Sequence, residues 1–174
     1  TWQRKKLGEV CKVKTGKRDA NHGNPNGKYH FFTCAKQHSY IDNYSFDTEA
    51  ILIAGNGDVG SCKYFKGKFD AYQRTYVLFD FVKDIDVIYL FTYLQRYLKY
   101  SASNAKQGGT MPYIKLGFLQ KYEIPLPPLA EQKRIVKHLE QVLGDIRKAK
   151  ELNQQTLQDA SELLPAELAQ VFEE

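Results

Sequence analysis

The stretch PLPPLAEQKRIVKHLEQVLGDIRKAKELNQQTLQDASEL, residues 125–163, divides the chain into two parts of different character. Before it the sequence is aromatic and punctuated by glycines, whereas after Pro128 the next proline is Pro165 and the one glycine is Gly144. Prolines favour an extended linker and are tolerated in the first turn of a helix. We therefore predict two domains, residues 1–128 and residues 129–174, and we expect the second to be helical.

A heptad repeat runs through the second part, with mostly apolar residues recurring at alternating spacings of four and three. An isolated helix drifts off such a repeat, so the repeat predicts a dimer interface with another helix. The positions of this seam are Ile135, Leu139, Val142, Ile146, Ala149, Asn153, Thr156, Ala160 and Leu163. The polar Asn153 would fix register or partner number. A helix over 129–163 would be roughly 50 Å long, and Pro165 predicts a kink or a restart beyond it.

Strand-like and helical segments follow one another without regular alternation in residues 1–128, which favours an α+β fold over a doubly wound sheet. One amphipathic helix is predicted from Asp86 to Lys99, capped by Asp84 or Asp86. The expected strands are Glu9–Thr15, Tyr29–Cys34, Ala50–Ala54, Cys62–Phe65, Arg74–Phe81 and Tyr122–Pro125. We predict a mixed, mainly antiparallel sheet with one or two packed helices, followed by a long C-terminal coiled-coil helix.

Positive charge is confined to the first part of the chain. Residues 1–128 hold 19 Lys and Arg against 11 Asp and Glu, a net charge of +8, whereas residues 129–174 hold 6 against 9, a net charge of −3. This split is expected if the first domain faces a polyanion and the helix faces protein, although a solvated basic surface would look the same.

The composition argues against several other classes of protein. The sequence contains no apolar run of transmembrane length and no secretory leader, so we expect a cytoplasmic protein without membrane contact. The three cysteines, Cys11, Cys34 and Cys62, form no CxxC pair, and the four histidines lack metal-ligand spacing. We expect reduced thiols and no metal. Because Thr1 and Trp2 include no initiator Met, we also expect a trimmed chain or a piece of a longer one.

The motif Gly55-Asn56-Gly57-Asp58-Val59-Gly60 follows an apolar strand and matches GxGxxG, with Asp80 about 20 residues on, as in dinucleotide-binding folds. The residues after Gly60 show no helical periodicity, so no helix N-terminus is expected to bind a pyrophosphate. We interpret the motif as a turn that lets the backbone approach DNA, with a nucleotide-binding enzyme as the alternative.

Further candidates for DNA contact lie in a second glycine turn and at basic positions near predicted turns. In Lys12-Val13-Lys14 both lysines should lie on one strand face, although a solvated face is an equally good explanation. The GxSxG, HExxH and P-loop lysine motifs are absent from the sequence, so no catalytic residues are predicted. The complete set predicted to contact DNA is Lys14, Thr15, Lys17, Arg18, Asn56, Gly57, Asp58, Arg74, Lys106, Gln107, Gly108, Gly109 and Thr110.

Four segments in this order resemble the specificity subunits of type I restriction–modification enzymes. They are WQRKKLGEVCKVKTGK (2–17), ILIAGNGDVG (51–60), QGGTMPYIKLGFLQKYEIPLPPLAEQKRIV (107–136) and LLPAELAQVF (163–172), and PLPPLAEQKRIV is the most specific. The chain matches one target-recognition domain and one conserved helix, which is half of such a subunit. The ending Phe172-Glu173-Glu174 departs from the basic and glycine residues common there.

The resemblance implies a non-catalytic half-subunit that reads one half of a split double-stranded DNA target. It implies a homodimer, or pairing with a second half-subunit through the helix, and recruitment of methyltransferase and restriction subunits. No cofactor is expected in this chain, and S-adenosylmethionine would be bound by the methyltransferase subunit. A coiled-coil adaptor that never contacts DNA is the alternative. Whether the chain is a natural half-subunit or a fragment stays open.

Overall fold

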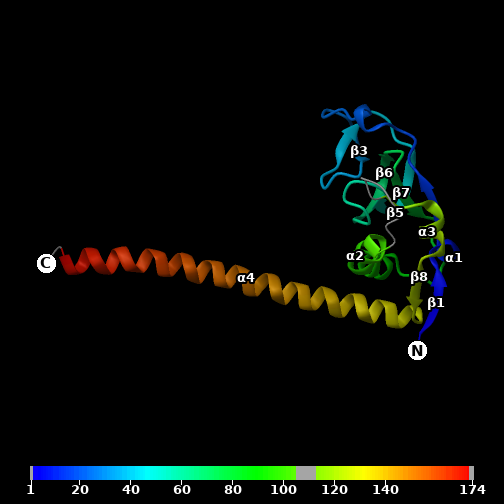
Figure 1. The fold of residues 1–174 in the computed structure, drawn as a ribbon. Coiled ribbons are helices and arrows are strands. Elements are labelled where there is room, and N and C mark those ends of the chain that lie inside the picture. Colours follow the sequence, from blue (N-terminus) through cyan, green and yellow to red (C-terminus); the bar gives the residue numbers. More distant parts are fainter. Residues whose placement is uncertain (1, 105–112, 173–174) are drawn as a thin grey trace. The chain divides into compact units, whose positions relative to one another are not determined.

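A computed structural model describes residues 2–104 and 113–172 (Figure 1). The chain forms two compact units, Thr1–Lys133 and Arg134–Glu174. In unit 1 the strands β2 to β7 form one six-stranded sheet in the order β2-β7-β5-β6-β3-β4, in which only the β3–β6 pair is parallel. The strands of this sheet are β2 (Lys12–Thr15), β3 (Tyr29–Phe32), β4 (Ser39–Ile41), β5 (Phe46–Ala54), β6 (Cys62–Ala71) and β7 (Thr75–Phe79). The predicted α+β fold with a mixed, mainly antiparallel sheet is confirmed.

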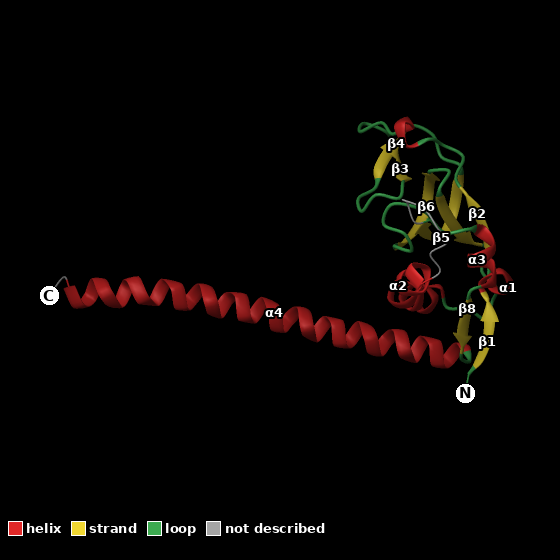
Figure 2. Ribbon diagram, in the orientation of Figure 1, coloured by secondary structure: helices red, strands yellow, loops and turns green. Residues whose placement is uncertain are grey.

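The central strand β5 is buried on both faces. Ile51 and Ile53 point to the helical side, where they pack in one core cluster with leucines of α2 (Val87–Asn104), which lies beside the sheet in Figure 2. Ala50 and Leu52 point to the other face, into a second cluster that contains Phe32 and Phe69. Alternate side chains of a strand lie on opposite faces, so burial of both faces explains the unbroken apolar run 50–54.

The helix α2 is the amphipathic helix that the sequence predicts. Leu90, Leu94 and Leu98 are fully buried along one face. At its start a carboxylate oxygen of Asp86 accepts a hydrogen bond of 2.9 Å from the N–H of Tyr89. Asp86 rather than Asp84 is therefore the side chain that caps the helix.

The sheet curls until its first strand meets the end of the fourth. Arg18, just beyond β2, forms a parallel bridge with Tyr72, just beyond β6, although β7 and β5 lie between these strands in the sheet order. The N–H of Gly16 donates to the carbonyl of Thr75 at 3.2 Å. A Cβ atom at Gly16 would lie 1.8 Å from the carbonyl oxygen of Ala71, so this closure requires a residue without a side chain.

A second, two-stranded sheet connects distant parts of unit 1. The strand β1 (Gln3–Lys6) pairs antiparallel with β8 (Glu123–Leu126). Two short helices, α1 (Leu7–Val10) and α3 (Leu116–Lys121), precede β2 and β8 and contact each other. Leu7, Leu119 and Ile124 are fully buried in the helical core cluster, which makes this small sheet part of the domain core.

Several predicted boundaries in unit 1 were wrong. The expected strand Glu9–Thr15 is helical up to Val10, because Leu7 and Val10 share a buried face and the Glu9 carboxylate accepts from the Lys6 N–H at 2.9 Å. The hairpin β5–β6 extends further from its turn than predicted, to Phe46 on β5 and to Ala71 on β6, because aromatic residues of the second core cluster extend the pairing to Phe46 and Phe69. Arg74 lies in a turn before β7, and β1, β4, α1 and α3 were not predicted at all.

The helix α4 runs from Leu129 to Phe172, and Figure 1 draws it as one unbroken helix. The predicted long C-terminal helix is confirmed, but the predicted kink or restart is not seen as an interruption, since Pro165 lies inside the helix. A proline removes a single hydrogen bond, and the turns on either side keep their own. None of the helices in residues 2–104 and 113–172 is long and apolar enough to cross a membrane.

Gln132 anchors the first turn of α4 within unit 1. Its side chain is fully buried, accepts from the Asp86 N–H at 2.8 Å, and donates to the carbonyls of Asp84 at 2.9 Å and Pro127 at 2.8 Å. All of its hydrogen-bonding atoms therefore have partners from the cap of α2 and the proline linker. Nothing in the heptad pattern indicated this role.

Replacing Gln132 by Glu should destabilise unit 1 by about 2 kcal/mol at neutral pH, because a carboxylate cannot donate to the two buried carbonyls. Burial raises the pKa of such a carboxyl above its unfolded value, so the folded state binds the proton more tightly. The loss of unfolding free energy relative to the wild-type chain should therefore become smaller as the pH falls toward about 4. Urea unfolding at pH 7 and at about pH 4.5 measures this, with the exposed Gln141→Glu as control. A pH-independent loss equal to that of the control would contradict the proposed hydrogen-bonding role.

Candidate nucleic-acid interface

Three segments that are far apart in the sequence meet at one edge of the curled sheet. They are residues 15–18, which begin at the last residue of β2, residues 55–60 between β5 and β6, and residues 72–75, which end at the first residue of β7. Together they are called the turn cluster below. The Gly55 N–H donates to the carbonyl of Arg74 at 2.9 Å, and the Gln73 N–H donates to that of Arg18 at 2.9 Å. The structure thus brings together the predicted segments that contain Lys17, Arg18 and Arg74.

The glycine motif at 55–60 is a tight turn that leads into a strand. Gly57 and Gly60 have φ angles of 65° and 80°, values that glycine adopts most readily. The turn is closed by the Gly60 N–H, which donates to Ala54 at 2.9 Å, and the chain continues as β6. A helix N-terminus, which a pyrophosphate site of the dinucleotide type requires, is therefore not formed after this motif.

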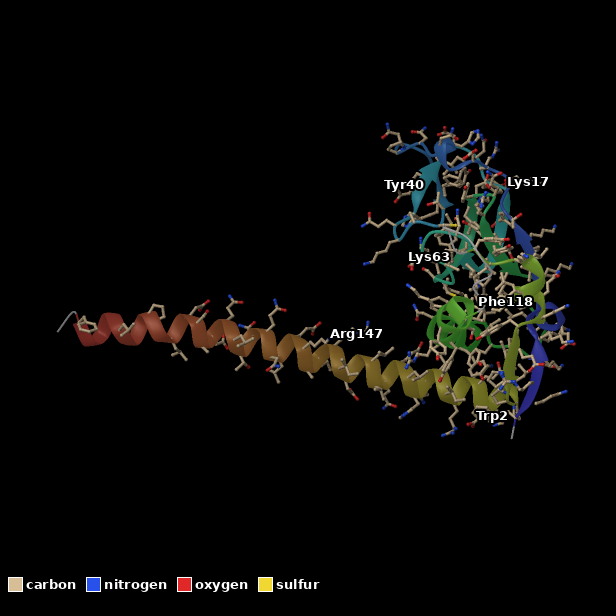
Figure 3. All side chains as sticks on the ribbon, in the orientation of Figure 1. Trp2, Lys17, Tyr40, Lys63, Phe118 and Arg147 are labelled. Atoms are coloured by element: carbon tan, nitrogen blue, oxygen red, sulfur yellow. The ribbon has the colours of Figure 1, made fainter. Side chains whose placement is uncertain are left out.

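The side chains of the turn cluster differ in how firmly they are held. Thr15, Lys17 and Arg74 are exposed, and Lys17 lies at the periphery of unit 1 in Figure 3. Asn56 is half-buried. The Asp58 carboxylate pairs with the Lys99 ammonium at 2.5 Å, and this hydrogen bond lowers the pKa of Asp58. Asp58 is thus engaged within the domain, and it ties the turn to α2.

Lys14 lies on β2, on the strand face that carries Lys12. Both lysines are exposed while Val13 packs against the core, as the alternation predicted. Lys12 pairs with Asp80 at 2.6 Å, and the Lys14 ammonium lies 5.5 Å from the centre of the Phe79 ring. Lys12 is engaged by this ion pair, and Lys14 is the lysine of that face nearer to the turn cluster.

The second predicted turn, which contains Lys106, Gln107, Gly108, Gly109 and Thr110, lies outside the described residues. The chain that follows it returns to the turn cluster, where the Ile114 N–H donates to the Gly55 carbonyl at 2.9 Å. The Tyr76 hydroxyl also donates to the carbonyl of Ile114 at 2.8 Å. A hollow of about 330 Å³ opens here, lined among others by Arg74, Tyr113 and Lys115.

An aromatic and cationic cluster beside β3 and β4 was missed at the sequence level. The His30 ring lies 4.6 Å from His38 and 4.7 Å from Phe65 between ring centres, and the Lys63 ammonium donates to the carbonyl of Ala35 at 2.7 Å. Loss of hydration, followed by electrostatic interaction with the neighbouring His30 and Lys63, lowers the pKa of His38. The signal was the repeated aromatic residues in 29–32 and 38–40, which only strand pairing brings together.

Metal and thiol chemistry have no support in the part of the chain that the structure describes. It contains no group of three or more His, Cys, Asp or Glu side chains that could bind a metal ion. Burial raises the pKa of Cys11 and of Cys62 to about 12, so both thiols are protonated at neutral pH and inert. Cys34 is half-buried, and its thiol donates to the carbonyl of Arg74 at 3.3 Å.

The heptad seam lies along α4. Ile135 is half-buried, whereas Leu139, Val142, Ile146, Ala149, Asn153, Thr156, Ala160 and Leu163 are exposed. Leu143 and Leu157 widen the apolar strip, and Leu157 is 70% exposed. A long apolar strip on a helix is costly to leave in water, which makes this face a candidate for contact with another helix.

Comparisons with known proteins agree on one family. Residues 1–156 match the family described as "Type I restriction modification DNA specificity domain". The chain is 40% identical over 149 residues to the type I restriction enzyme EcoDI specificity subunit of Escherichia coli, a match that covers 86% of this chain and 33% of that protein. It is 29% identical over 102 residues to a putative type I restriction enzyme specificity subunit of Haemophilus influenzae, covering 58% of this chain and 26% of that protein.

Solved structures show the same fold. The type I restriction–modification S subunit of M. genitalium matches with a TM-score of 0.68 and 19% identity, over 80% of this chain and 38% of that one. A structure described as bearing on complex assembly and conformational transition of the type I R-M system matches with a TM-score of 0.71 and 25% identity, over 89% and 41%.

The matched region spans about a third of the length of the EcoDI subunit and somewhat more of the solved chains. The predicted resemblance of the four segments to type I specificity subunits is therefore confirmed, as is the placement among proteins without catalytic activity of their own. The chain belongs to the type I restriction–modification DNA specificity family, the non-catalytic specificity subunits of these systems.

Proposed function

We propose that unit 1 reads one half of a bipartite double-stranded DNA target. The observation that carries this proposal is the turn cluster, where backbone hydrogen bonds gather three basic or glycine-rich segments at one edge of the curled sheet. The net charge of +8 in residues 1–128 supplies the attraction to phosphates. Side chains on short loops fixed by a sheet can then be presented to base edges.

We further propose that α4 pairs with the helix of a second copy or of another half-subunit. A helix of 44 residues is roughly 66 Å long at 1.5 Å per residue. Two recognition domains on such a spacer could contact half-sites more than one DNA turn apart, since one turn measures about 34–36 Å. The paired chains would act in the cytoplasm and recruit methyltransferase subunits, which would carry S-adenosylmethionine, and through them restriction subunits.

Selection from a randomised duplex pool tests the proposal directly. A DNA reader enriches one half-site sequence, whereas a coiled-coil adaptor enriches none. Binding to the enriched duplex should weaken steeply between about 50 and 200 mM salt, because each phosphate contact adds about 0.9 to the slope of log affinity against log salt. A salt-independent affinity, or a pool that stays random, would reject the DNA-reading role.

Lys17→Met should weaken binding to all duplex sequences about equally and reduce the salt slope by about 0.9, because Lys17 is an exposed residue of the turn cluster and suits a phosphate contact. The matched control is Lys83→Met, which removes an exposed lysine beyond the opposite end of β7. Fluorescence anisotropy over a salt series measures both slopes. Equal salt slopes for the two variants would show that Lys17 does not contact DNA.

A further inference from the structure

A buried carboxylate, that of Asp70, pairs with Arg18 of the turn cluster. Asp70, near the end of β6, is completely buried, and its oxygens accept hydrogen bonds from the Ser45 hydroxyl at 2.9 Å and from the Ala71 N–H at 2.8 Å. Its ion-pair partner is Arg18, whose Nε lies 3.3 Å from Oδ2. A buried charge is tolerated only when it is paired and hydrogen-bonded, so Arg18 and Ser45 together satisfy Asp70.

Arg18 is held at both its backbone and its side chain. Its carbonyl accepts from the Gln73 N–H at 2.9 Å, and the residue bridges Tyr72. Its side chain is 42% exposed although Nε is bound to Asp70. Among the residues that the structure describes, none accepts a hydrogen bond from the two terminal nitrogens Nη1 and Nη2. The guanidinium thus has one anchored edge and an outer edge with two parallel donors.

This arrangement differs from that of the neighbouring lysine. Lys17 is exposed, and within the described ranges it forms no ion pair. A flexible lysine of this kind is suited to contact a phosphate. A guanidinium that is already fixed loses little side-chain entropy on binding, and its two terminal donors match two acceptors in one plane. The O6 and N7 atoms of guanine in the major groove are such a pair.

We propose that Arg18 reads a guanine in the half-site through Nη1 and Nη2, and that Asp70 and Ser45 are positioning residues that fix its guanidinium. This inference rests on the proposed DNA-reading function and adds one base-specific contact to it. It assigns a role to Asp70 and Ser45, which would not touch DNA, and it separates Arg18 from the lysines that supply affinity without base preference.

The test compares base preferences of variants on the half-site selected by the wild-type chain. Arg18→Lys should lose about 10- to 100-fold in preference at one G·C pair, keep the preference at the other pairs, and leave the salt slope unchanged. Asp70→Asn should reduce the base preference at the same pair and at no other, because an amide has the shape of the carboxylate but no charge to hold the guanidinium. Ser45→Ala should do so more weakly.

Replacing the guanine of that pair by 7-deazaguanine removes the N7 acceptor. The wild-type chain should bind this duplex more weakly than the duplex with guanine. Arg18→Lys should bind both duplexes with equal affinity, because it makes no contact with N7. A purely structural role of Asp70 would lower thermal stability without moving the preference at a single pair. Thermal unfolding of each variant is therefore measured in parallel.

Arg18→Met alone would leave Asp70 buried without a cation and could unfold the domain. The double variant Arg18→Met with Asp70→Asn removes both charges and keeps the experiment decisive. The inference fails if the double variant retains every base preference, or if it weakens all sequences equally with a slope reduced by about 0.9, which would make Arg18 a phosphate contact. A wild-type chain that selects no sequence would instead overturn the DNA-reading function itself.

Discussion

Replacing Val142 and Ile146 together by Glu is expected to weaken pairing of the chain at least about 1000-fold, which corresponds to roughly 4 kcal/mol. The two residues lie one turn apart on the seam of α4 and are 40% and 45% exposed. In a paired helix these positions would be buried in the seam, where a carboxylate loses its hydration without gaining a partner. Sedimentation velocity over a concentration series measures the dissociation constant.

The matched control replaces Gln141 and Gln154 by Glu. It adds the same two negative charges to exposed positions of α4 outside the seam, and Gln and Glu have similar helix propensities. The control should pair like the wild-type chain, while thermal unfolding of unit 1 should be the same in all three proteins. An unchanged dissociation constant in the Val142 and Ile146 variant would show that the heptad seam is not the pairing surface.

Gly16→Ala should destabilise unit 1 by at least about 3 kcal/mol. The new Cβ would lie 1.8 Å from the carbonyl oxygen and 2.2 Å from the carbonyl carbon of Ala71, and 2.7 Å from the carbonyl oxygen of Tyr72. All three atoms belong to the backbone, which cannot rotate aside as a flexible side chain can. Overpacking of a buried site commonly costs about 1–3 kcal/mol, and here the closure of the curled sheet itself must open.

Denaturant unfolding of Gly16→Ala measures this loss, and DNA binding should fall with it, because the same closure holds residues 15–18 against 72–75. Gly117→Ala is the control: Gly117 lies in α3, and a Cβ there would meet nothing within 4 Å. Alanine is favoured over glycine in helices, so the control should be neutral or slightly more stable. Equal stability of both variants would rule out the close approach at Gly16.

The elements that the sequence predicted well are those whose signal is local and repeated. The heptads predicted α4, and the apolar spacing after Asp86 predicted α2, with Asp84 or Asp86 as its cap. The strand ILIA was visible as a continuous apolar run. The short elements β1, α1 and α3 have no such periodicity. The two helices are stabilised by packing of Leu7 and Leu119 in a core made by distant parts of the chain, and β1 by its pairing with β8.

The residues of the candidate site also fall into those that the sequence could indicate and those that it could not. Lys17, Arg18, Arg74 and the turn 55–60 could be selected from residue type and turn chemistry alone. Their gathering at one edge depends on the bridge between Arg18 and Tyr72. The partners Asp70 and Ser45 could not be chosen from the sequence, since Asp70 lies 52 residues from Arg18 and shares no pattern with it.

The sequence by itself determined the α+β class, the long helix with its seam, the charge split and the family, because periodicity, composition and motif order are properties of the chain alone. Only the tertiary structure decided why residue 16 is glycine, why Gln132 is buried, and why Arg18 is held by Asp70. Each of these depends on contacts between residues far apart in the chain. Such contacts exist only once the chain has folded, and local preferences do not encode them.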